Sequence, residues 1–507
     1  MSFFRKLFQN NQQKTGQGNE IEVFPSLQKN IAYIQQWLFY TDDLKWRNIR
    51  FNGRDGVILY LESVADTKEI QAGVIKPIEQ AKEGNITEII TAVDVKYERK
   101  LNAISQSLLQ GSAVLLFDGI GEACLVQVVA SYHRDVKEPD NEGVVRGAHG
   151  GFIENLSVNL FLVRNRLESQ NLVVRYYQLG DATKTKVAVL YMQDLANPDL
   201  VKEVDHRLRS ISIDTIISPG YIAELTENNP YSPFPQILFT ERPDRTVAHL
   251  MEGRVAILAE GDPTALIVPV TLFAFYQTPD DFHSRWIVGS FIRVIRLASF
   301  LIAFQLPAFY IAVVSFHAEV LPANLIDTVK SSVERVPFPP ILEALVMELT
   351  LELIREAGIR LPSRVGQTIG IVGGLVIGDA VVRTGLVSYP MVIVVSLTAI
   401  SSFVVPSYEM SSAVRFLRFP LMAMAALFGF VGIVFGLLFI MIHLSKLESF
   451  GTAYLAPFIP LRIKDLKDTF VRLPIWFLNQ RPHDPHPKRL NQERYSRGWE
   501  HDDQGEE

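Results

Sequence analysis

The stretch Pro339–Gly358, PPILEALVMELTLELIREAG, decides how the rest of the chain is interpreted. It is nearly as apolar as a membrane helix, yet it carries four glutamates: Glu343, Glu348, Glu352 and Glu356. At about 100° per residue the last three form one stripe along a helix. The neighbouring stripe is apolar and consists of Leu342, Val346, Leu349 and Leu353. At about 1.5 Å per residue the stretch is roughly 30 Å long, close to the hydrocarbon thickness of a bilayer.

A carboxylate that faces lipid costs kilocalories, so this acidic row must face water, protein or cations. We expect Glu348, Glu352 and Glu356, together with Glu343 off the row, to line an ion path through an oligomer. The alternative is an amphipathic surface helix whose acidic face is solvated. Such interfacial helices usually carry Lys and Arg on the polar face, whereas this one offers only Arg355 and Arg360 near its end.

The 507 residues suffice for two or three domains, and their composition divides them. Up to about Arg296, charges and turn residues occur throughout, as in a soluble α/β protein, whereas Leu297 to about His443 is mostly apolar. The net charge of −6 is small for this size and argues against a nucleic-acid partner. The lone cysteine, Cys124, excludes an intramolecular disulfide framework and lies in an apolar strand, which favours an inert buried thiol. No signal peptide opens the chain, so we expect the N-terminal part to stay in the cytosol.

Two parts of the soluble region resemble each other. Val187–Asp205 resembles the segment from Val57 onward in strand, acidic turn and helix, and Val255–Val270 resembles the predicted hairpin Ala113–Val129. A diverged duplication would give two related α/β lobes, although strand–turn–strand units also resemble one another by chance.

The predicted fold class is therefore an α/β cytosolic N-terminal region of two related lobes, followed by an all-α polytopic membrane domain. We divide the chain into a disordered N-terminus (1–22), a first lobe (23–135) and a connecting motif with the second lobe (136–283). A transmembrane domain (284–450) and a cytosolic tail (451–507) follow, and we expect the tail to be disordered after about residue 482.

The connecting motif has a charged loop with four glycines ahead of an amphipathic helix. A glycine-rich turn that leads into a helix can bind phosphate through free N–H groups. No Gly-Lys-Ser/Thr follows, and the alternative is a structural turn in which Arg146 pairs with Glu138 or Glu142.

In the membrane region, Trp286, Arg293 and Arg296 precede the apolar run Leu297–Phe316, which places this edge on the cytosolic side. Further spans are predicted at Val365–Leu386, Met391–Val405 and Leu421–His443. Two of these spans carry glycines at four-residue spacing, which is typical of close helix packing: Gly370, Gly374, Gly378, Gly432 and Gly436. The number of membrane crossings stays open. If both ends of the chain lie in the cytosol, the number is even, so either the acidic helix does not cross or one of the weaker spans is re-entrant. Arg415 and Arg418, just before the last span, fit neither scheme. In the tail, Trp476 and Phe477 suggest an element at the membrane interface.

The chain shows no nucleophile elbow, Walker motif or zinc signature, so neither an enzyme nor a catalytic, cofactor or metal site is expected. His483 and His486 lie close together but in a tail expected to be solvated. The candidate functions are channel, transporter and membrane receptor subunit.

Several stretches resemble the A-subunit family of GerA-type spore-germination receptors. They are VKEPDNEGVVRGAHGGFIENLSVNLFLVRNRL, RVPFPPILEALVMELTLELIREAGIRLP, GQTIGIVGGLVIGDAVV, SSFVVPSYEMSSAVRFLRFPLM and DTFVRLPIWFLNQRP. The resemblance covers about residues 30–482. The start YTDDLKWRNI is similar to the nutrient-receptor type, although the family also includes relatives expressed with the forespore's own ion and dipicolinate transport proteins.

This resemblance implies a multi-pass protein of the spore inner membrane, with its N-terminal domain on the core side. It implies a membrane B subunit that holds the nutrient, a lipoprotein C subunit, and a ring of A subunits that opens as a channel for monovalent cations. In a ring each glutamate becomes a circle of carboxylates, which attracts cations. A non-conducting scaffold or signal-relay subunit and a proton-coupled transporter subunit remain as alternatives, and the germinant and the copy number stay open.

Overall fold

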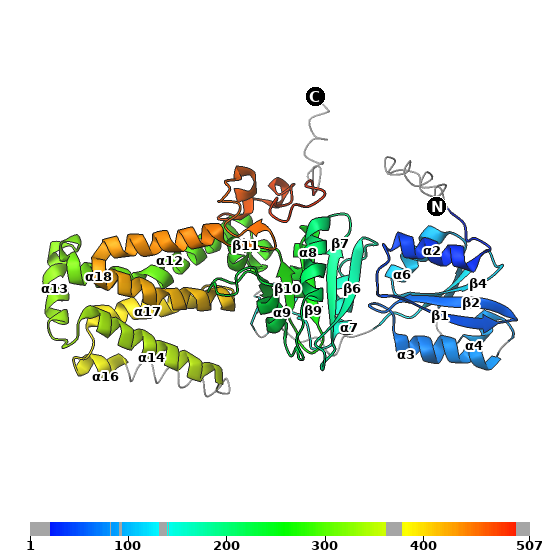
Figure 1. The fold of residues 1–507 in the computed structure, drawn as a ribbon, viewed down its shortest axis with the longest axis horizontal. Coiled ribbons are helices and arrows are strands. Elements are labelled where there is room, and N and C mark those ends of the chain that lie inside the picture. Colours follow the sequence, from blue (N-terminus) through cyan, green and yellow to red (C-terminus); the bar gives the residue numbers. More distant parts are fainter. Residues whose placement is uncertain are drawn as a thin grey trace, which may run out of the picture.

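The computed structural model describes residues 21–81, 83–90, 94–130, 139, 141–144, 146–360 and 378–492. They form two lobes built on sheets, followed by a helical region (Figure 1). Residues 1–20 and 493–507, which belong to the segments expected to be disordered, lie outside the described residues.

The first lobe is a five-stranded antiparallel sheet with the strand order β1-β2-β4-β5-β3. Its strands are β1 (Leu44–Phe51), β2 (Arg54–Leu61), β3 (Val95–Glu98), β4 (Ser112–Phe117) and β5 (Ala123–Gln127). Helices α2 (Leu27–Trp37) and α6 (Leu101–Leu109) cover one face, and α3 (Thr67–Glu69), η1 (Ile70–Ile75), α4 (Lys76–Ala81) and α5 (Ile86–Ile89) belong to the other (Figure 1). Because successive strand residues point to opposite faces, Val57 and Leu59 pack with the first pair of helices and Ile58 packs with the second group.

The second lobe repeats this arrangement with the strand order β6-β7-β9-β10-β8. Its strands are β6 (Leu172–Leu179), β7 (Thr185–Met192), β8 (Leu238–Thr240), β9 (Val255–Ala259) and β10 (Ala265–Val268). The helices are α7 (Leu156–Arg164), α8 (Pro198–Arg209), α9 (Pro219–Thr226) and α10 (Pro243–Met251). Each strand of one sheet has its counterpart five strands later in the other, so the prediction of two related lobes is confirmed.

The lobes are joined by a buried ion pair and a shared core. Arg164 of α7 donates to Asp43 of the first lobe at 2.8 Å, and both side chains are buried. Asp43 also accepts hydrogen bonds from Thr41 and Ser63. One hydrophobic cluster contains residues from both sheets, which ties the two lobes together.

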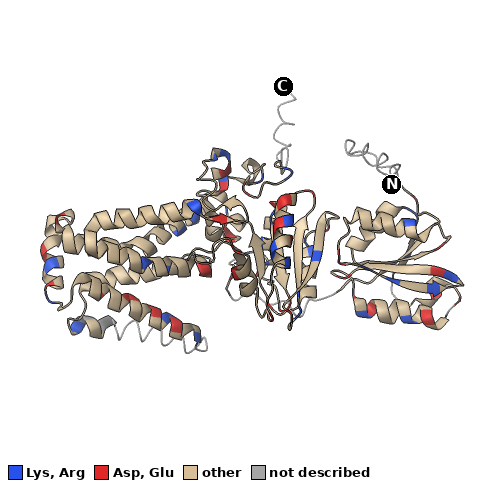
Figure 2. Ribbon diagram, viewed as in Figure 1, with Lys and Arg blue, Asp and Glu red and all other residues tan. Residues whose placement is uncertain are grey.

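The helical region begins with α11 (Asp280–His283) and α12 (Trp286–Phe316). It continues with η3 (Ala318–Val320), α13 (Ala323–Val333), α14 (Pro340–Arg360), α16 (Gly378–Arg383), α17 (Tyr389–Phe403) and α18 (Tyr408–Lys446). By length and composition α12 and α18 are able to cross a membrane. Charged residues are sparse along them, whereas α14 carries several (Figure 2). The polar segment around Lys330 forms the helix α13.

The last span, predicted as one straight helix over Leu421–His443, is wrong because α18 reverses direction at Gly429. This residue has φ 60° and ψ −138°, which is not helical. A Cβ built on Gly432 would lie 2.0 Å from the Met424 carbonyl oxygen, and one on Gly436 would lie 2.6 Å from Leu421. Residues eight or more positions apart are that close only if the chain reverses, so α18 is a hairpin of two arms, 408–428 and 430–446 (Figure 1).

After α18 the tail returns to the second lobe. It forms β11 (Glu448–Ser449), β12 (Thr452–Ala453), and the short helices η5 (Ile463–Asp468) and η6 (Ile475–Phe477). Asp484 forms a 2.7 Å ion pair with Arg254, the residue just before β9. The backbone N–H of Lys488 donates to the Leu195 carbonyl at 2.8 Å. Packing on the lobe therefore continues through residue 492, beyond the expected onset of disorder near 482.

Candidate functional site

Helix α14 presents its acidic side to the other helices and its apolar stripe to the outside. Leu342, Val346, Leu349 and Leu353 are exposed, whereas Glu343 and Glu348 are buried. This is the inverse of a soluble amphipathic helix. It fits a helix at membrane depth, where apolar side chains meet lipid or a neighbouring chain and carboxylates need protein partners.

Glu343 is held at the start of α17. Its Oε1 accepts hydrogen bonds from the Ser388 backbone N–H and hydroxyl, each at 2.5 Å. Ser388 is the N-cap of α17, and its hydroxyl lies 3.1 Å from the Tyr310 hydroxyl of α12. The carboxylate therefore satisfies a helix N-terminus, where a negative charge is favoured.

Glu348 forms an ion pair with Arg418 on the first arm of α18, and both side chains are buried. The Arg418 Nε also donates to the carbonyl of Ala303 on α12, at 2.8 Å. This pair therefore joins α14, α18 and α12 in the middle of the helical region.

The two remaining glutamates are more exposed. Glu352 pairs with Arg415 at 2.7 Å and keeps 30% of its side chain exposed, and Glu356 pairs with Arg360 of its own helix at 2.6 Å with 59% exposed. Between them Arg355 donates to the Ser402 hydroxyl of α17 at 2.7 Å. The acidic row thus runs from the buried Glu348 to the partly accessible Glu356, with the helix-capping Glu343 beside its buried end.

The arginines that pair with this row were missed as partners at the level of sequence. Arg415 and Arg418 are three residues apart, and their glutamates Glu352 and Glu348 are four apart, so each spacing places its pair on one helix face. Two arginines in an apolar run must find acids, which was the available signal. The pore-lining role of the four glutamates stays a prediction.

The predicted packing glycines fall in two groups. Gly370 and Gly374 lie outside the described residues, and Gly378 begins α16. Gly432 and Gly436 lie where the second arm of α18 meets the first; a Cβ on Gly432 would meet the backbone of Met424, and one on Gly436 would displace the Leu421 side chain.

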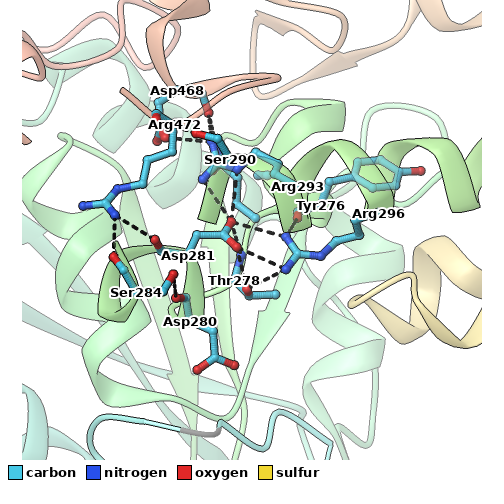
Figure 3. A network of polar contacts seen from close by, with 12 residues as sticks. Tyr276, Thr278, Asp280, Asp281, Ser284, Ser290, Arg293, Arg296, Asp468 and Arg472 are labelled. Atoms are coloured by element: carbon cyan, nitrogen blue, oxygen red, sulfur yellow. Dashed lines mark hydrogen bonds and ion pairs between the residues drawn. The ribbon is translucent and has the colours of Figure 1, made fainter. Parts of the chain in front are cut away.

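A second polar cluster joins the end of the second lobe, α12 and the tail (Figure 3). Asp281 of α11 lies between two arginines of α12, with Nη2 of Arg293 at 3.0 Å and Nη2 of Arg296 at 3.1 Å. Arg293 also pairs with Asp468 of the tail at 2.7 Å. Arg472 of the tail donates to the Asp281 carbonyl at 2.9 Å.

Two consequences follow from this cluster. Arg293 and Arg296 hold the start of α12 to α11, the second lobe and the tail, and their role in marking a membrane edge stays a prediction. Burial raises the pKa of Asp468 to about 6, and Arg293 only partly opposes this rise.

The glycine-rich loop is fixed by side-chain contacts, and its geometry does not support the predicted phosphate site. Glu142 pairs with Arg245 at 2.5 Å, not with Arg146, and Glu138 lies outside the described residues. At the start of α7 the Leu156 N–H donates to Glu260 at 3.2 Å, so a carboxylate already occupies that helix N-terminus.

The remaining candidate side chains have structural surroundings. Cys124 is buried, and burial raises its pKa to about 12. His483 lies 2.7 Å from Asp465. Within the part of the chain that the structure describes, no group of three or more His, Cys, Asp or Glu side chains is placed to hold a metal ion.

Comparison with known proteins assigns this architecture to a family. Residues 32–484 match the family described as Bacillus/Clostridium GerA spore germination protein. The chain belongs to the GerA family. Spore germination protein B1 of Bacillus subtilis is 41% identical over 472 residues, which are 91% of this chain and 98% of that protein. Spore germination protein A1 of the same organism is 39% identical, covering 88% of this chain and 93% of the relative.

Two further similar proteins extend the comparison. The uncharacterized membrane protein YfkQ of Bacillus subtilis is 38% identical over 91% of each chain. Among solved structures, the N-terminal domain of the A subunit of the Bacillus megaterium spore germinant receptor GerK3 is similar at 28% identity and a TM-score of 0.38. It covers 49% of this chain and 97% of its own.

Proposed function

We propose that this GerA-family chain is the A subunit of a nutrient-responsive germination receptor in the spore inner membrane, working with a membrane B subunit and a lipoprotein C subunit. The relatives named spore germination proteins support the receptor role. The lobes lie on the cytosolic, core side in this proposal. Lys446 at the end of α18 supports that orientation, since basic residues favour the cytosolic end of a span.

Copies of the chain form a ring that conducts monovalent cations when germinant is sensed. The observation that carries this part is the acidic row Glu348, Glu352 and Glu356 on the otherwise largely apolar helix α14, with Glu343 beside the row and with Glu352 and Glu356 still partly accessible. In a ring, Glu352 and Glu356 border the ion path directly. Glu343 and Glu348 reach it when α14 separates from α17 and α18 on opening.

A non-conducting relay subunit is the second candidate, and the ion pairs within one chain favour it. Glu348 and Glu352 already have guanidinium partners on α18. A paired carboxylate needs no cation beside it, so the row could serve to hold α14 in one position.

The test is ion flux through the complete receptor reconstituted in liposomes, with germinant added. We expect Glu352→Gln and Glu356→Gln each to lower the preference for cations over anions several-fold, because each removes a circle of charge from the path. Glu319→Gln is the matched control, since Glu319 is an exposed carboxylate on η3 outside the row.

A count of A subunits by native mass spectrometry separates the two candidates. Several copies per complex, with cation flux that depends on Glu352, support the channel. One copy per complex, or flux and selectivity that are the same in all variants, rejects it in favour of the relay subunit.

A further inference from the structure

The tail carries a group of exposed apolar side chains on two neighbouring turns. They are Phe458, Leu461, Ile463, Ile475, Trp476 and Phe477, which we call the tail apolar surface. Ile463 is 74% exposed, Leu461 63% and Phe477 54%. Large apolar side chains gathered at this exposure mark a site of contact rather than ordinary surface.

The tail apolar surface is built on a folded support. Phe470 packs between Phe458 and Phe273 of the second lobe, with ring centroids 6.3 and 5.3 Å away. The Leu473 N–H donates to the Lys467 carbonyl at 3.1 Å, which joins the two turns. The apolar side chains are therefore held outward by the packing beneath them.

Its position continues the outer face of α12. The Ser290 hydroxyl donates to the Arg472 carbonyl at 2.8 Å, three residues before Ile475. On the same first turns of α12, Ile287 and Phe291 are exposed. In Figure 1 the tail lies at the end of α18 next to the second lobe, at the level where the apolar helices meet the lobes.

The charge around this surface is positive. Arg462, Lys464 and Lys467 lie on the same turns, and the Lys467 ammonium donates to the Phe477 carbonyl at 3.2 Å. The neighbouring acids are engaged with other side chains, since Asp465 contacts His483 and Asp468 pairs with Arg293. Apolar anchors flanked by basic groups are typical of elements that bind anionic lipid headgroups.

We propose that the tail apolar surface lies in the headgroup layer of the membrane, on the leaflet nearest the lobes, and binds anionic phospholipid. Ile475, Trp476 and Phe477 enter the upper acyl chains, and Lys464 and Lys467 contact lipid phosphates. The tail then forms a second membrane contact outside the helices, fixed to α12 through Arg472. This binding does not depend on whether the chain conducts ions.

The experiment uses the full-length chain in lipid nanodiscs with one environment-sensitive label. Cys124 is the single cysteine, so Cys124→Ala provides the background for Phe477→Cys labelled with NBD. Tyr231→Cys is the matched control, because Tyr231 is 97% exposed on the second lobe. In nanodiscs with phosphatidylglycerol, we expect NBD emission at position 477 to shift to the blue and to be quenched by nitroxide-labelled lipid several-fold more than at position 231.

The charge contribution is tested in the same labelled chain. Lys464→Gln with Lys467→Gln, or replacement of phosphatidylglycerol by phosphatidylcholine, should each reduce the lipid quenching at position 477 at least two-fold. Quenching by aqueous iodide equal to that at position 231 would overturn the proposal. So would a blue shift without lipid quenching that grows with protein concentration, since that result means a second copy or another protein covers the surface.

Discussion

At the scale of single residues, the Glu348–Arg418 pair decides how α14 sits in the helical region. Both side chains are buried, so each charge depends on the other for solvation. The neighbouring pair, Glu352 with Arg415, keeps more of its carboxylate exposed. The two pairs have the same chemistry but different burial, which makes them a natural comparison.

We predict that Arg418→Met lowers the free energy of unfolding by about 3 to 5 kcal/mol, because it leaves Glu348 buried without a counter-ion. Arg415→Met should cost about 1 kcal/mol or less, since Glu352 can still reach polar surroundings. Thermal unfolding in detergent measures both. The double variant Glu348→Leu with Arg418→Met should recover most of the loss. A double variant as unstable as Arg418→Met alone would show that the loss comes from altered side-chain packing and not from the unpaired charge of Glu348.

The partners of these glutamates could not be predicted from spacing alone. The helical period placed the acids of α14 on one face, and that face is the one turned inward. Which helix supplies the arginines depends on how α14 and α18 cross. This is set by packing between segments more than fifty residues apart, and no local pattern records it.

At the scale of elements, the turn at Gly429 changes the course of the chain through the helical region. Gly429 takes a positive φ that only glycine adopts readily, and a Cβ there would lie 3.0 Å from the His317 ring at the end of α12. The first arm of α18 therefore carries Arg415 and Arg418 alongside α14, and the second arm returns toward the lobes.

We predict that Gly429→Ala destabilises the helical region by about 1 to 3 kcal/mol, because the added methyl meets both a strained backbone and its neighbours. Gly358→Ala is the control. A Cβ at that helical position has open space, so the substitution should be neutral or slightly stabilising. Thermal unfolding of the two variants in the same detergent makes the comparison. Equal stability of the two would mean that the turn tolerates a side chain.

The strands that begin near Val57 and Val187, the hairpin Ala113–Val129 and the helix α14 were predictable because each follows a local period or a turn residue. The hairpin of α18 was not, since hydropathy runs unbroken from Leu421 to His443 and a glycine's φ leaves no trace in it. The helix α13 was missed for a related reason. Its polar residues resemble those of a linker, and none of its residues is buried.

At the scale of the whole molecule, the tail completes the second lobe after the chain has passed through the helical region. Tyr454 is fully buried in the core that the two lobes share, and its hydroxyl donates to the Pro235 carbonyl at 2.7 Å. Residues far apart in the sequence thus form one folding unit. The domain limits at about residues 135, 283 and 450 stay predictions.

We predict that Tyr454→Ala lowers the free energy of unfolding by about 3 to 5 kcal/mol and exposes residues 448–492 to protease, because it removes a large buried ring from this core. Tyr231→Ala, at an exposed position of the same lobe, should change neither. Limited proteolysis followed by mass spectrometry locates the cleavage. A destabilised variant whose tail resists cleavage as well as the wild-type tail would contradict the proposed role of Tyr454 in docking the tail.

The second lobe forms hydrogen bonds to the helical region at two separate points. Arg296 near the start of α12 donates to the Tyr276 carbonyl at 2.6 Å, and His443 near the end of α18 lies 2.8 Å from the Ser232 hydroxyl. Because the lobe contacts two helices, it cannot rotate about either helix alone without breaking its contact with the other. Any rotation of this lobe must therefore twist α12 and the second arm of α18 together.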